Sequence, residues 1–212
     1  MTETPRARAA GRDLVCRIVY WGPSRSGKQA NLRAVHEGSV PERRDALRAA
    51  PSGPSGGRRR DFLAIELGEV SGHVVRLHLH ALPGSPYHHA SRWRGLAAAD
   101  GVVFVVDPQA RRVQENLTSL RELYDAVAAQ GEDPRTFPVV FQYGKQDLPE
   151  AMCQPIAAWE ALLNPWQAPS FAAVARRGVG VFETLRSITG RALARRAADA
   201  ASASAPGGGH DA

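Results

Sequence analysis

The sequence predicts an α/β domain in which a mostly parallel sheet of six strands carries helices on both faces. Three observations favour this class. Strand-like stretches alternate along the chain with stretches of helical spacing, which is the order expected when helices join parallel strands. Residues 101–106 form a continuous apolar run, as expected for a strand buried on both faces. A chain of 212 residues has the length of one such domain with short tails.

The first elements surround a glycine-containing loop. An apolar stretch over residues 14–21 predicts the first strand, and a helix is predicted from about residue 28 to residue 36. Residues 51–57 consist of proline, serine and glycine, so we expect a flexible loop there.

The middle of the chain predicts three more strands. Residues 61–67 and 74–82 read as two neighbouring strands with a turn at residues 71–73, and they are expected to form one antiparallel edge pair. The third strand is the apolar run, taken as residues 101–107.

The last part of the chain predicts two helices and a buried strand. Residues 116–130 have apolar side chains at helical spacing, including Leu117, Leu120 and Leu123. Residues 137–143 predict a strand, and residues 181–196 an amphipathic helix.

These elements place one domain at residues 14–197. The first 13 residues are expected to be a disordered leader. Residues 198–212 are rich in alanine, serine and glycine and predict a disordered tail.

Charge is distributed unevenly along the chain, whose formal net charge is +6. Residues 1–60 hold 13 basic and 5 acidic residues, a balance of +8, and residues 61–212 hold 14 and 16, a balance of −2. The basic first part fits either a solvated surface or contact with an acidic partner. Because the sequence has no RNA-binding, zinc-finger or helix-turn-helix pattern, no nucleic-acid partner is expected. No apolar run is long enough to cross a bilayer, and we expect a cytoplasmic protein without integral membrane contact.

The loop after the first strand carries the pattern of a phosphate-binding loop, Gly22-x-x-x-x-Gly27-Lys28. The glycines let the backbone curl so that successive amides face phosphate oxygens, and the helix N-terminus adds positive potential. Lys28 would reach the β- and γ-phosphates. Position 29 departs from the pattern, because Gln29 stands where a serine or threonine hydroxyl would bind Mg²⁺.

A second signature follows the strand at residues 137–143. Gly144-Lys145-Gln146-Asp147 is similar to the Asn-Lys-x-Asp motif with which GTPases read guanine. In that motif the aspartate accepts hydrogen bonds from the base, the lysine covers base and ribose, and the asparagine braces the phosphate loop. Only 2 of the 27 basic residues are lysines, and both, Lys28 and Lys145, lie in these two signatures. The alternative for Asp147 is a helix cap after a strand.

Several segments in order resemble the bacterial Ras-like small GTPases of the MglA (gliding-motility) type, from about residue 17 to about residue 188. They are residues 17–23, 27–32, 61–63, 67–70, 83–84, 101–107, 142–149 and 178–185. The resemblance implies a P-loop NTPase fold of the Ras-like G-domain type, with GTP or GDP as the ligand, and leaves the need for Mg²⁺ open. It also implies a Roadblock-type regulatory protein as a possible partner.

The resemblance places the nucleotide on residues of both signatures and on a third loop. These residues are Gly22, Ser24, Arg25, Ser26, Gly27, Lys28, Gln29, Ala30, Lys145, Asp147 and Ala175. In the family, the loop of Ala175 contacts the guanine O6 through a backbone amide. No metal-ligating residue is assigned.

The positions at which this sequence differs from the family are mostly those that take part in GTP hydrolysis. Gln29 replaces a metal ligand, the switch-I threonine has no clear counterpart, and Ser85 stands in place of the glutamine that positions the attacking water. Metal bridging of phosphate oxygens and water positioning are central to hydrolysis. We therefore expect GTP hydrolysis to be very slow or absent.

A few further side chains have two interpretations each. Arg58, Arg59 and Arg60, and Arg25 in the phosphate loop, could neutralise phosphate charge or could be solvated. Ser85 and the three consecutive arginines are the only catalytic candidates, and they are weak ones. The histidines His78, His80, His88 and His89 could start a zinc site or could be exposed or hydrogen-bonded.

Three functions fit the sequence. The first is a guanine-nucleotide-dependent switch. The second is a pseudo-GTPase, a scaffold that keeps the fold without the nucleotide cycle. The third, a P-loop enzyme that uses ATP, is disfavoured because Lys145 and Asp147 favour guanine.

Overall fold

A computed structural model describes residues 14–50, 60–70, 73–84 and 89–204. Its strands are β1 (Leu14–Trp21), β2 (Arg48–Ala50), β3 (Arg60–Val70), β4 (His73–Ala81), β5 (Gly101–Val106), β6 (Val139–Tyr143) and β7 (Ser170–Ala172). Its helices are α1 (Lys28–Gly38), α2 (His89–Leu96), α3 (Val113–Ala128), α4 (Ile156–Leu163) and α5 (Val181–Ser204).

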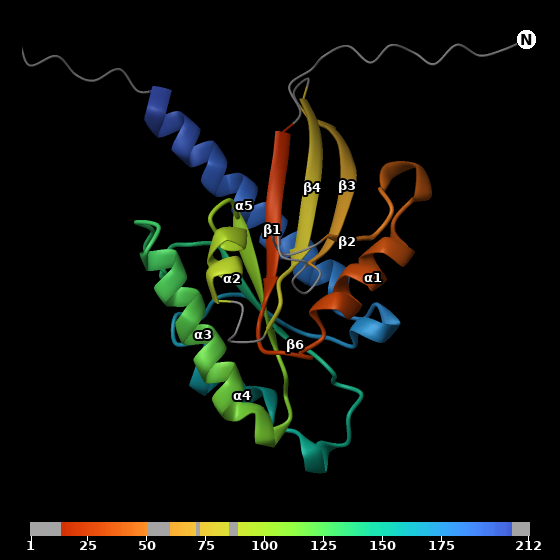
Figure 1. The fold of residues 1–212 in the computed structure, drawn as a ribbon, viewed down its shortest axis with the longest axis vertical. Coiled ribbons are helices and arrows are strands. Elements are labelled where there is room, and N and C mark those ends of the chain that lie inside the picture. The colour runs from red at the N-terminus through yellow and green to blue at the C-terminus, as the bar shows by residue number, and fades with distance from the viewer. Residues whose placement is uncertain (1–13, 51–59, 71–72, 85–88, 205–212) are drawn as a thin grey trace, which may run out of the picture.

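The strands form one sheet in the order β2-β3-β4-β1-β5-β6-β7 (Figure 1). The five strands from β4 to β7 are parallel to one another. Strand β3 is antiparallel to β4, and β2 is antiparallel to β3. The predicted α/β class, the mostly parallel sheet and the antiparallel edge pair are confirmed. The sheet has seven strands where six were expected, and the short strands β2 and β7 are the two that had no assigned residues in the sequence.

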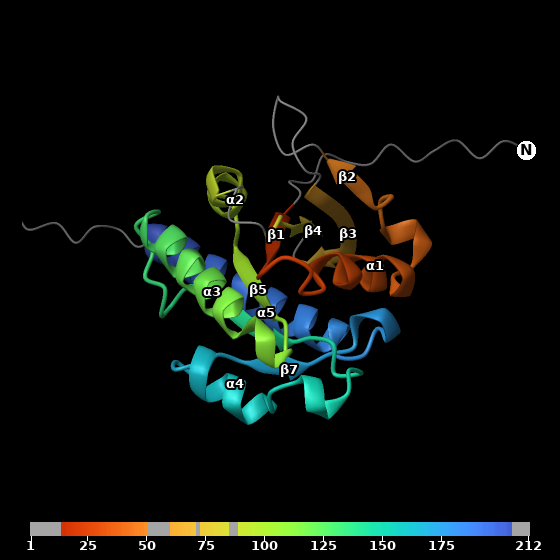
Figure 2. The same ribbon diagram turned by 60° about the horizontal axis from the view of Figure 1, so that its bottom comes forward.

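Helices cover both faces of this sheet (Figure 2). They enclose two hydrophobic cores, one on each face. Helices α1 and α5 pack on one face, and α2, α3 and α4 pack on the other. Strand β5 lies between the two cores and is buried along its whole length. Val103 and Val105 face the first core, whereas Val102, Phe104 and Val106 face the second. This position explains why the strand is apolar at every residue.

The ends of several elements differ from the prediction. Helix α5 continues to Ser204, beyond the predicted helix end at residue 196 and the predicted domain end at residue 197. Residues 197–202 of this helix are exposed and mostly alanine, the strongest helix former, so the helix continues there without burial. The predicted leader (residues 1–13), the loop at residues 51–57 and the tail from residue 205 onwards lie outside the described residues. In the described part of the chain, no helix is long and apolar enough to span a membrane.

Candidate nucleotide-binding site

Three parallel strands in the middle of the sheet end at the same edge. These strands are β1, β5 and β6, and β5 lies between the other two. The segments that follow them are Gly22–Gly27, Asp107 and Gly144–Asp147. The helices after β1 and β5 cover opposite faces, so the strand order reverses between these two strands. In open α/β sheets, ligands bind at such a point, outside the carboxyl ends of the strands.

The loop after β1 has the backbone that a phosphate-binding loop requires. Gly22 and Gly27 have φ values of 138° and 114°, and Arg25 has a left-handed φ of 63°. A Cβ atom on Gly22 would lie 2.4 Å from the carbonyl oxygen of Val105, so only glycine fits there. The amide of Ser26 donates to the Pro23 carbonyl oxygen at 3.3 Å, which closes the loop just before α1 begins.

Lys28 lies across the loop, and its side chain is buried. Its Nζ donates to the carbonyl oxygens of Gly22 at 2.9 Å and of Pro23 at 2.6 Å. Burial, followed by the nearby charges of Arg92, Arg112 and Lys145, lowers the pKa of Lys28 to about 7. The hydrogen-bond partners of the ammonium are neutral oxygens, and the nearby cations outweigh the opposing carboxylate of Asp107. An anion in the loop would therefore stabilise the charged form of Lys28.

A pocket of about 1230 Å³ opens above this loop. Its lining comprises Ser24, Arg25, Ser26, Gly27, Lys28, Gln29, Ala30, Arg33, Ala34, Glu37, Ala81, Leu82, Pro83, Gly84, Arg112, Ala175 and Arg176. Five of these residues are basic, and Glu37 is the one carboxylate among the described lining residues. Such a surplus of positive charge in a concave site attracts polyanions.

The segment after β4 rests directly on the phosphate loop. A Cβ atom on Gly84 would lie 2.3 Å from the backbone nitrogen of Ser24 and 2.4 Å from the carbonyl carbon of Pro23. The amide of Leu82 donates to the Tyr20 carbonyl oxygen at 3.2 Å, which continues the pairing of β4 with β1 up to this contact. The backbones of the two segments therefore touch, and glycine is the residue that permits it.

The turn after β6 contains the predicted base-reading residues. Lys145 has a left-handed φ of 57°, and its Nζ donates to Asp107 Oδ2 at 2.7 Å. Asp147 is exposed in the same turn. The amide of Gln146 donates to the carbonyl oxygen of Ala173, which ties the turn to the segment after β7. In the described structure, the pocket lining includes Ala175 but neither Lys145 nor Asp147.

Comparison with known proteins identifies the family. No protein-family model matches the chain. The chain is similar to the Mutual gliding-motility protein MglA of Myxococcus xanthus (strain DK1622), with 38% identity over 179 residues, which cover 84% of this chain and 91% of that protein. This chain belongs to the MglA-like small GTPases. The resemblance noted in the sequence is therefore confirmed at the level of the family, which binds nucleotides, and the α/β fold agrees with it.

Some predicted residues of this MglA-like protein cannot be placed. Arg58, Arg59, Ser85 and His88 lie outside the described residues, as do Ser71 and Gly72 of the predicted turn. Arg60 is the first residue of β3, and its side chain is outside the described part as well.

The histidines on β4 have an aromatic neighbour. The ring of Phe62 lies 5.2 Å from that of His78 and 4.9 Å from that of His80. Among the described residues, no group of three His, Cys, Asp or Glu side chains could hold a metal ion.

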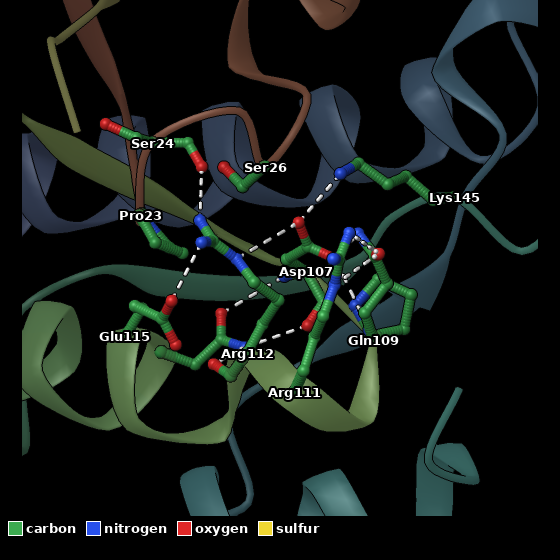
Figure 3. Close-up of polar contacts among 12 residues, drawn as sticks. Pro23, Ser24, Ser26, Asp107, Gln109, Arg111, Arg112, Glu115 and Lys145 are labelled. Carbon is green, nitrogen blue, oxygen red and sulfur yellow. Dashed lines mark hydrogen bonds and ion pairs between the residues drawn. The ribbon is translucent and has the colours of Figure 1, made fainter. Parts of the chain in front are cut away.

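Two residues of the site were not singled out from the sequence. Arg112, from the turn Ala110–Arg112 that precedes α3, donates from Nη2 to the Ser24 carbonyl oxygen at 2.6 Å (Figure 3). Asp107 is 1% exposed, and its carboxylate accepts from Lys145. A polar residue directly after a fully apolar strand was a usable signal for Asp107. The sequence offered none for Arg112, because 88 positions separate it from Ser24.

Proposed function

We propose that this MglA-like protein binds a guanine nucleotide in the pocket above Gly22–Lys28 and acts as a molecular switch or regulatory scaffold, with impaired hydrolysis. The observation that carries the proposal is the basic pocket at the strand edge, with Lys28 inside it and the turn of Lys145 and Asp147 beside it. Backbone amides and cations at the loop can bind the phosphates. Asp147, which follows β6, can accept hydrogen bonds from the guanine base.

The pocket fits a metal ion less well than it fits phosphates. A hard cation such as Mg²⁺ prefers carboxylate and hydroxyl oxygens. Among the described lining residues, the pocket holds the carboxylate of Glu37 against Arg25, Lys28, Arg33, Arg112 and Arg176. Gln29, at the position where the family has a hydroxyl ligand, also lines the pocket. We therefore propose that arginines supply part of the charge neutralisation, and that nucleotide affinity depends less on Mg²⁺ than in an intact Ras-like protein.

Isothermal titration with GDP and GTP, with Mg²⁺ and then with a chelator, tests this proposal. We expect binding in both conditions with similar affinity, and an affinity that collapses with the chelator would contradict the reduced metal dependence. The variant Asp147→Asn should weaken GDP binding and improve xanthosine diphosphate binding, because an amide can donate where the carboxylate accepts. The absence of any nucleotide binding would instead favour the pseudo-GTPase scaffold.

Hydrolysis is proposed to be very slow or absent, since water positioning and metal bridging both depend on replaced residues. The double variant Gln29→Thr with Ser85→Gln should increase single-turnover GTP hydrolysis more than either single change. Rapid hydrolysis by the unaltered protein would contradict this part of the proposal and leave a conventional switch.

The partner and the process are extensions from the family. A Roadblock-type regulatory protein is the partner class that we propose for the switch loops. The name of the M. xanthus relative also refers to gliding motility, and a role in that process is part of this proposal. Co-purification of this protein with a Roadblock-type protein from the same cells, in the presence of GTP or of GDP, would test the partner, and gliding of cells that lack this protein would test the process.

A further inference from the structure

We infer that Arg112, Asp107 and Lys145 form a charged bridge that couples the phosphate loop to the base-reading turn, and that Arg112 and Asp107 are positioning residues for the nucleotide site. The inference rests on the proposed function only in taking the two segments as parts of one ligand site. The coupling between the segments is a property of the free protein and is argued from its contacts.

The first end of the charged bridge holds the phosphate loop. Arg112 Nη2 donates to the Ser24 carbonyl oxygen at 2.6 Å, and Nη1 donates to Glu115 Oε1 at 2.8 Å (Figure 3). The same guanidinium places its Nε 3.7 Å from Asp107 Oδ2, which is an ion-pair distance. A planar guanidinium can contact several acceptors in fixed directions, so the position of the loop becomes tied to that of the carboxylate.

The centre of the charged bridge is the carboxylate of Asp107, which is fixed from several sides. Its Oδ1 accepts from Gln109 Nε2 at 2.9 Å. Asn116, itself fully buried, accepts from the Asp107 amide at 3.1 Å and donates to the Asp107 carbonyl oxygen at 2.8 Å. Since both cations approach the same oxygen, Oδ2, a shift of one cation changes the electrostatic environment of the other.

The second end of the charged bridge holds the base-reading turn. Lys145 Nζ lies 2.7 Å from Asp107 Oδ2 while its backbone has a left-handed φ of 57°. A non-glycine residue keeps such a backbone only where its surroundings impose it, and this ion pair is one such constraint.

The neighbouring Gly144 has no side chain with which to brace the phosphate loop. A Cβ atom there would lie 3.4 Å from the Ser26 carbonyl oxygen, so the two backbones are close. Among the described residues, the charged bridge therefore connects the phosphate loop and the base-reading turn through side chains, which Gly144 cannot do.

Amide hydrogen exchange in the nucleotide-free full chain tests the coupling directly. Lys145→Met should accelerate exchange at Ser26, whose amide is bonded within the phosphate loop, although Lys145 does not contact that amide. Arg112→Met should accelerate exchange at Leu148, whose amide donates to the Lys145 carbonyl oxygen at 3.0 Å. We expect each effect to be about 2- to 30-fold, the range of energetic couplings between residues of a contact network. Both side chains are partly exposed, so both variants should fold.

Arg111→Met is the matched control. Arg111 neighbours Arg112 in the same turn, and its Nη2 donates to Gln109 Oε1 at 2.9 Å. Its replacement removes the same charge, but it should leave exchange at Ser26 and Leu148 within about twofold of the parent, below the range expected for coupling. The double variant of Arg112 and Lys145 should have less than the product of the two single effects, because either change alone interrupts the charged bridge.

GDP affinity provides a second measurement. Arg112→Met should lower the affinity for GDP roughly tenfold, as expected for the loss of a charged hydrogen bond. Adding Gly144→Asn to this variant should recover part of the affinity, because it places a side chain next to Ser26. Exchange effects confined to the altered end of the charged bridge would overturn the inference. If a substitution at one end accelerates exchange at the other end while neither the parent nor any variant binds GDP, that result would support the charged bridge and contradict the proposed guanine-nucleotide function.

Discussion

At the scale of single residues, Lys28 has the most informative environment. Burial lowers the pKa of Lys28 to about 7 in the folded protein, from its ordinary value of 10.5. Between these two pH values the unfolded chain keeps a proton that the folded chain has released. The free energy of unfolding of the ligand-free protein should therefore rise as the pH increases through this window, as far as Lys28 determines it.

This pKa leads to a prediction about ligand binding. A polyphosphate in the pocket stabilises the charged form of Lys28 and raises its pKa, so binding above pH 7 should take up a proton. Titration calorimetry with GDP at about pH 8.5, a value between the two pKa values, in two buffers of different ionisation enthalpy measures this uptake. We expect the binding heat of GDP to differ between the two buffers in the parent protein and to be the same in both buffers in Lys28→Met. Identical heats in the two buffers for the parent protein would contradict the prediction.

At the scale of elements, helix α2 carries a buried arginine that links it to two neighbouring elements, in addition to its apolar contacts through Trp93 and Leu96. Arg92 is 2% exposed, and its guanidinium lies 4.0 Å from the centre of the Trp21 ring, at the end of β1. It forms an ion pair with Glu122 of α3 and donates to Ser119 Oγ at 3.1 Å. Burial lowers the pKa of Arg92, and Glu122 opposes that shift. Arg92 thus connects α2 both to β1, the strand that leads into the phosphate loop, and to α3.

The prediction for Arg92→Met is a loss of about 3 kcal/mol in the free energy of unfolding, because Glu122 loses its partner in a mostly buried position. Urea denaturation measures the change. Arg94→Met on the exposed face of the same helix is the control and should shift stability by less than about 0.5 kcal/mol. Replacing Glu122 by glutamine as well should recover part of the loss. Equal stability of the Arg92 and Arg94 variants would show that the ion pair does not hold α2.

The elements were also the part that the sequence predicted best. Continuous or alternating apolar residues identified β1, β3, β4, β5 and β6, because burial of one or both faces of a strand leaves a direct pattern in the residues. The ends of elements were less accurate, as at α5, where alanine propensity extends the helix beyond its buried part. The strands β2 and β7 have three residues each and are too short to leave a periodic pattern.

At the scale of the whole molecule, the sheet brings together residues that no local pattern connects. The positions of the Gly22–Lys28 loop and of the Lys145 turn could be predicted, since each follows a recognisable strand. That the side chain of Arg112 would lie against Ser24 and near Asp107 depends on the packing of α3 beside β1 and β5. Such contacts between distant parts of the chain require the tertiary structure, and they make up much of the candidate site.

The contact of Gly84 with the backbone of Pro23 and Ser24 has a consequence for the time course of binding. A nucleotide that needs this segment to move cannot enter faster than the segment opens. The observed association rate of fluorescent GDP, measured by stopped flow, should then reach a plateau as its concentration rises. A rate that increases linearly throughout would contradict this. If the contact re-forms over the bound nucleotide, dissociation requires the same opening, so the barrier lengthens the residence time as much as it delays entry and leaves the dissociation constant unchanged. This small backbone contact would thus determine how long a nucleotide stays, independently of how tightly it is held.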